Sequence, residues 1–119
     1  MYKFVFRIRQ RYFDQIVAGT KTVEYRKDIY FWQLRINNIF SALGLKMMTY
    51  PVANNNIVFD VPLTKDDNVQ AVFICGKRKH LREATGIARI ITPDYFSEQG
   101  KKDVDTPRCF AFLLGEAIP

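Results

Sequence analysis

Residues 11–26 join a helical pattern to a strand pattern through a single glycine. The apolar residues of the first half recur at the three- and four-residue steps of a helix: Phe13, Ile16 and Val17. Gly19 follows at the position where many helices end in a left-handed residue. Residues 22–26 then alternate between polar and apolar, as they do along a strand. The run therefore predicts a helix over residues 11–18, a turn at Gly19 and a strand directly after it.

The predicted strand has charged residues on one of its two faces. Its alternation directs Val23 and Tyr25 towards a core and places Glu24 and Arg26 on the opposite face. Lys21 stands at the mouth of the preceding turn. A lysine, a glutamate and an arginine thus gather at one helix–turn–strand junction, and this arrangement predicts a small polar site.

The spacing Gly-x-Lys-x-x-Glu-x-Arg, formed here by Gly19, Lys21, Glu24 and Arg26, resembles the motif of the ASCH domain family (activating signal cointegrator homology). The resemblance extends to three further apolar segments, which are Tyr2–Arg9, Gly86–Ile91 and Cys109–Leu114. Residues 33–70 match nothing in that family, so the resemblance does not extend over the middle of the chain.

The resemblance implies a PUA-like fold, which is a small mixed β-barrel flanked by two or three helices, with the motif lining a cleft. Domains of this family are associated with binding RNA or other nucleic acids, and some members hydrolyse acetylated cytidine or cut RNA. We therefore expect a single α+β domain over residues 1–119 that binds RNA or a nucleotide, with DNA as an alternative partner.

The chain is basic, with a formal net charge of +6 and a pI near 9.5. Its cations cluster in two stretches, one before any acidic residue (Lys3, Arg7, Arg9 and Arg11) and one interrupted only by Glu83 (Lys77, Arg78, Lys79, Arg82 and Arg89). Acidic residues gather instead in Asp94–Asp105 and at Asp66 and Asp67. A basic side of this kind is the usual electrostatic footprint of nucleic-acid binding, although a solvated basic surface gives the same pattern.

Composition argues against several classes of protein. A hydrophobic content of 48%, with ten Phe and six Tyr, suits a β-rich core. No apolar run approaches the ~18 residues of a membrane span, and the charged start of the chain does not read as a signal peptide. Cys75, Cys109 and His80 lack the spacing of a zinc site. We expect a cytoplasmic protein with reduced thiols that needs no metal or cofactor and contacts no membrane, and its oligomeric state stays open.

Strand patterns outnumber helical ones along the rest of the chain. Strands are predicted at Lys3–Arg9, Ile57–Val61, Ala71–Cys75, Gly86–Thr92 and Cys109–Leu114. A second helix is predicted at Ile29–Leu43, capped by Asp28 and ended by Gly44, and a short third one at Pro93–Gln99. This order favours a mixed α+β barrel over a parallel sheet built from βαβ units.

The candidate ligand-binding residues come from the motif, its neighbours and the second basic stretch: Gly19, Lys21, Thr22, Glu24, Arg26, Trp32, Lys77, Arg78 and Lys79. Lysine holds a phosphate as a point charge, and arginine grips it bidentately. Glu24 can accept a hydrogen bond from the exocyclic amine of a base or a proton from a water, and Trp32 can stack on a base. Each residue also has a purely structural interpretation: a solvated lysine, an ordinary Glu–Arg pair, a core tryptophan and a solvated basic run.

Two other functions fit the same residues. In a hydrolase acting on a modified nucleoside or on RNA, Lys21 and Glu24 would be the catalytic residues. ASCH-like acetylcytidine amidohydrolases use the motif lysine with a threonine near the position that Glu24 occupies here, and Thr22 lies two residues earlier on the same strand face. The remaining alternative is a protein-interaction domain that uses other surfaces.

Overall fold

The computed structural model describes residues 1–45, 57–91 and 108–119, with only the backbone described for residues 57–59. The elements follow the order β1 (Tyr2–Arg7), α1 (Gln10–Ala18), β2 (Val23–Lys27), α2 (Tyr30–Leu43), β3 (Ile57–Pro62), a 3₁₀ turn (Lys65–Asp67), β4 (Val69–Cys75), β5 (Arg78–Ile91) and β6 (Arg108–Ile118). The predicted helix at Pro93–Gln99 lies outside the described residues. The other predicted elements each overlap an observed one, but three of them extend beyond it: β1 ends at Arg7 rather than Arg9, β2 begins at Val23 rather than at residue 22, and α2 begins at Tyr30 rather than Ile29. Thr92, the last residue of the strand predicted at Gly86–Thr92, lies outside the described residues.

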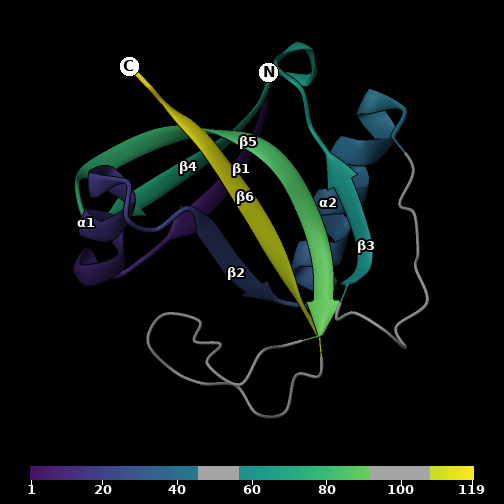
Figure 1. Cartoon of the computed structure of the whole chain (residues 1–119), viewed down its shortest axis with the longest axis horizontal. Helices are drawn as coiled ribbons and strands as arrows, with labels where there is room; N and C mark the ends of the chain where they lie inside the picture. Colours follow the sequence, from purple (N-terminus) through teal and green to yellow (C-terminus); the bar gives the residue numbers. More distant parts are fainter. Residues whose placement is uncertain (46–56, 92–107) are drawn as a thin grey trace.

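The strands form one curled, mixed sheet that makes a half-barrel (Figure 1). Its order is β1–β4–β5–β6–β2, and β3 pairs with β5 off this path. β1 is parallel to β4, whereas the other neighbours are antiparallel. β1 and β2 therefore lie at the two ends of the described sheet, so each has one unpaired edge.

β5 is the longest strand and serves both halves of the sheet. Its first half pairs with β4 and its second half with β3, while β6 runs along its other side. The ladder to β6 shifts register between Arg82 and Gly86. A Cβ atom on Gly86 would lie 3.2 Å from Leu113 Cδ1, so glycine permits the close approach of the strands there. Residues 86–91 of the strand predicted at Gly86–Thr92 and the basic residues Arg78, Lys79 and Arg82 before it are thus parts of one element.

The core fills the inside of the curl and is rich in aromatic rings. The ring of Phe6 lies 4.9 Å from that of Phe112 and 5.1 Å from that of Trp32, measured between centroids. α2 buries Trp32, Ile36 and Phe40 against the same core. This packing places α2 next to β1.

Two glycines end the helices as predicted. Gly19 and Gly44 have φ angles of +80° and +71°, and their N–H groups return to carbonyls of the last turn of α1 and α2. The prediction that Asp28 caps α2 was wrong, because the cap position is Ile29 and no side chain bonds there. The Asp28 carboxylate instead accepts hydrogen bonds from Gln33 Nε2 at 2.7 Å and Arg89 Nε at 2.6 Å.

Candidate functional site

β2 turns its charged residues inwards. Glu24 and Arg26 are only 6% and 5% exposed, whereas Val23 and Tyr25 are half-buried. The prediction that Val23 and Tyr25 face the core was therefore wrong. The alternation gave the period of the strand correctly, but the inner face of β2 is the polar one.

Glu24 lies between two cations that offset the free-energy cost of burying its charge. Its Oε1 is 3.0 Å from Lys21 Nζ, and its Oε2 is 3.2 Å from Arg26 Nη2. Lys21 Nζ also donates a hydrogen bond to the Val23 carbonyl at 2.8 Å. A buried charge requires partners of this kind, because desolvation otherwise penalises it heavily. The three side chains together carry one net positive charge.

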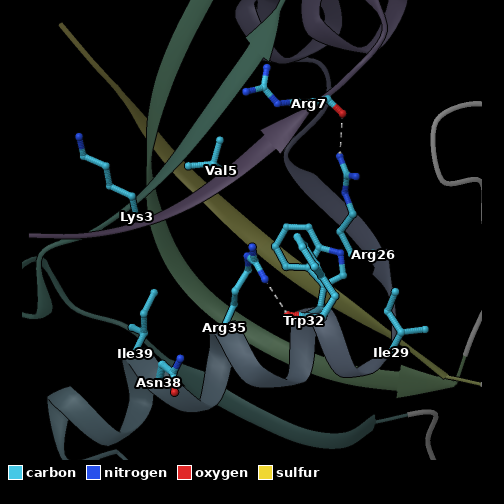
Figure 2. A pocket seen from close by; sticks show the side chains of 10 residues that line it. Lys3, Val5, Arg7, Arg26, Ile29, Trp32, Arg35, Asn38 and Ile39 are labelled. Atoms are coloured by element: carbon cyan, nitrogen blue, oxygen red, sulfur yellow. Dashed lines mark hydrogen bonds between the residues drawn. The ribbon is translucent and has the colours of Figure 1, made fainter.

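Arg26 links the two ends of the sheet. Its Nη2 donates to the Arg7 carbonyl of β1 at 3.4 Å (Figure 2). Its guanidinium carbon lies 5.2 Å from the ring centre of Phe6 and 5.6 Å from that of Trp32, both within cation–π range. Since β1 and β2 share no ladder in the described sheet, this side chain spans the opening between them.

A cavity of about 660 Å³ opens beside Arg26, between β1 and α2 (Figure 2). Its described lining residues are Lys3, Val5, Arg7, Arg26, Ile29, Phe31, Trp32, Arg35, Asn38 and Ile39. Four of these ten are cations and none is a carboxylate. The cavity is therefore a concentrated positive site with apolar walls, and its size is typical of small-molecule sites.

Aromatic and cationic groups stack at the start of α2. The Arg35 guanidinium carbon is 3.4 Å from the ring centre of Phe31, and Arg35 Nη1 donates to the Phe31 carbonyl at 3.2 Å. Phe31 remains 47% exposed. A flat surface with positive charge thus borders the cavity, which is a suitable platform for an aromatic, anionic ligand.

Two of the predicted motif-region residues, Arg26 and Trp32, line this cavity. Trp32 is also a core residue, since only 5% of it is exposed. Lys21 and Glu24 are not among its lining residues. Glu24 pairs directly with Arg26, and Lys21 is connected to Arg26 only through Glu24. Gly19 and Thr22 are exposed, on either side of Lys21.

The second basic stretch lies elsewhere. Lys77, Arg78 and Lys79 belong to the hairpin between β4 and β5, and none of the three is among the lining residues of the cavity. Arg78 Nη1 pairs with Asp14 of α1 at 3.0 Å, with both side chains about half exposed. The hairpin therefore packs its arginine on α1.

His80 follows in the same hairpin and faces α1. Its ring lies edge-on to Phe13, with 6.4 Å between centroids. Its Nε2 is buried and has no hydrogen-bond partner among the described residues. Burial and the charge of Arg82 lower the pKa of His80 from its ordinary value of 6.5.

Sequence reasoning missed Lys3, Arg7 and Arg35 as site residues. The first two were recognised as part of a basic stretch, and Arg35 follows Phe31 by four positions, which places them on one helix face. No local signal shows that β1 and α2 lie side by side. That contact arises from the packing of Phe6 on Trp32.

Comparison of the chain with protein-family models, curated proteins and solved structures gave no match. The described residues contain no cluster of three or more His, Cys, Asp or Glu side chains suited to a metal ion. Among the described helices, none combines the length and the apolar character needed to cross a membrane.

Proposed function

We propose that this chain binds single-stranded RNA, or one nucleotide unit of it, in the cavity between β1 and α2. The supporting observation is the charge of the cavity: four of its ten described lining residues are cations and none is a carboxylate. One of the four, Arg26, is held in a fixed orientation by Glu24 and by the Arg7 carbonyl. A preorganised guanidinium suits a phosphate group, which it can grip with two hydrogen bonds.

In this proposal the other lining residues bind different parts of the nucleotide. Lys3 and Arg35 add positive charge beside Arg26, and the Arg35 guanidinium stacked on Phe31 offers a flat surface on which a base can stack. A cavity of about 660 Å³ admits a nucleotide but is too small for a duplex. A single nucleotide is also the unit that proteins mostly recognise in RNA, because sequence-specific recognition mostly uses unpaired bases that are turned out of the stack.

In this proposal Lys21 and Glu24 position Arg26. Both are engaged in ion pairs, and the Lys21 ammonium also bonds the Val23 carbonyl. The hydrolase alternative required these two groups to face a substrate, yet neither is among the lining residues of the cavity. Binding without hydrolysis is therefore the function that the geometry favours.

The test is the affinity of a short, labelled single-stranded RNA at two or more salt concentrations, measured by fluorescence anisotropy. Arg35→Ala removes one exposed cation of the cavity and is expected to weaken binding and to reduce the salt slope by about one phosphate contact. The matched control is Lys79→Ala, which removes an exposed cation of the hairpin. Its effect on affinity should be small.

Two results would contradict the proposal. The first is a wild-type protein that binds neither RNA nor a nucleotide at low salt. The second is a loss of binding in Lys79→Ala with none in Arg35→Ala, which would move the interface to the hairpin.

A further inference from the structure

β1 leaves one backbone edge open. In a parallel ladder, alternate residues turn both their N–H and their C=O towards the partner strand. The amide of Tyr2 donates to the carbonyl of Asn68, just before β4, and the amide of Ile8 to that of Ile74 in β4, both at 3.0 Å, so the even-numbered residues of β1 face β4. The N–H and C=O groups of Lys3, Val5 and Arg7 therefore point the other way.

This open edge faces the cavity, because the same three residues are among its lining residues. The Arg7 carbonyl accepts its hydrogen bond from Arg26, which agrees with the outward direction of these groups and occupies that end of the edge. No described strand pairs with the rest of the edge. Lys3 and Val5 thus present backbone donors and acceptors to whatever enters the cavity.

A nucleobase suits this short edge better than a peptide strand does. A peptide that adds to a sheet gains affinity from a succession of main-chain bonds, and here Arg26 ends the series after Lys3 and Val5. A base needs only a neighbouring donor and acceptor, which every base carries on its Watson–Crick edge. The cations around the cavity then match the phosphate of the same nucleotide.

We infer that the backbone N–H and C=O of Val5 bind the Watson–Crick edge of an unpaired base, while its phosphate lies among the cations of the cavity. This inference rests on the proposed function and names the base as the group that is recognised. The site accordingly prefers a nucleotide to a sugar phosphate. It also rejects duplex RNA, whose Watson–Crick edges are already paired.

The test compares Val5→Pro with Val5→Ala. The Val5 N–H makes no bond to β4, so proline removes the outward donor without removing a ladder bond, and edge strands tolerate proline at such positions. Alanine keeps the N–H and loses only side-chain contacts. The ligands are a nucleoside monophosphate and ribose 5-phosphate, with affinities measured by calorimetry.

Wild type and Val5→Ala are expected to bind the nucleoside monophosphate about tenfold more tightly than the sugar phosphate, as ordinary hydrogen bonds to a base would give. In Val5→Pro this ratio should fall towards one, with the affinity for ribose 5-phosphate retained. An equal ratio in the proline and alanine variants would overturn the inference.

Amide hydrogen exchange of the wild type gives a second readout, which remains valid if Val5→Pro fails to fold. The Val5 amide should become protected when the nucleoside monophosphate is added, and much less so with ribose 5-phosphate. Binding of both ligands without a base preference would overturn this inference and leave the proposed function intact. Protection by an acidic peptide, with no nucleotide binding, would overturn both and assign the edge to a peptide strand.

Discussion

At the scale of single residues, Glu24 is the carboxylate that stabilises the buried Arg26. It is a buried carboxylate whose two oxygens each contact a different cation. Replacing a buried ion pair as a whole can be neutral, but removing one partner leaves an uncompensated charge inside the protein. Glu24 therefore matters mainly because Arg26 is buried beside it.

Glu24→Ala is expected to lower the free energy of unfolding by about 3 kcal/mol, since Arg26 then loses its carboxylate partner in a buried site. Urea denaturation measures this loss. The control is Asp14→Ala, which breaks the half-exposed pair with Arg78 and should cost less than about 1 kcal/mol. Similar losses in the two variants would show that Glu24 does not hold a buried charge in place.

The residue types of the site could be predicted from the sequence only in part. The motif identified Arg26, and its neighbourhood identified Trp32, because both lie close to the glycine turn in the chain. Lys3 and Arg35 could not be assigned, because they meet Arg26 only through the tertiary packing of β1 and α2. The sequence also could not predict which face of β2 is buried. The buried face is the polar one, and ion pairs rather than apolar contacts stabilise it.

At the scale of elements, the helix ends followed from local chemistry. A glycine after an amphipathic run predicts a left-handed stop, and both α1 and α2 end in this way. The full length of β5 could not be predicted in the same way, because its basic first half and its apolar second half look like two different elements in the sequence. They form one strand because β6 pairs along both.

Gly19→Ala is expected to destabilise the protein by about 1 kcal/mol, because the left-handed conformation at a φ of +80° is unfavourable for alanine, whose Cβ atom crowds the backbone there. A Cβ atom there would meet nothing within 4 Å, so no clash adds to this cost. Thermal unfolding measures the change. Gly19→Asn should cost less, since asparagine tolerates this conformation better, and equal losses would point to a different cause.

At the scale of the whole molecule, stability should depend on pH through His80, a residue of β5 whose ring contacts Phe13 of α1. Its pKa is lowered in the folded state, by burial first and by Arg82 second. The unfolded chain therefore takes up a proton as the pH falls through 6.5, while the folded protein still resists it. The contribution of neutral His80 is present above pH 6.5 and is lost as the pH falls towards the lower, folded-state pKa.

His80→Gln removes this titration, so its melting temperature should fall less than that of the wild type between pH 7 and pH 5. Scanning calorimetry of the two proteins over this range checks the prediction. The carboxylates titrate in both proteins, and their effect cancels in the comparison. Parallel curves would mean that His80 has similar pKa values in the folded and unfolded states.

The pairing of the two end strands has a consequence for the order in which the protein acquires its site. β1 and β2 come from the first 27 residues, yet β1 pairs with β4 and β2 pairs with β6, at Val69–Cys75 and Arg108–Ile118. During synthesis, both strands leave the ribosome long before their partners exist. A nascent chain that ends ahead of β6 has no ladder to hold β2, so Arg26 cannot yet face β1. The proposed binding site should therefore form late, when β6 has emerged and the sheet can close around its core.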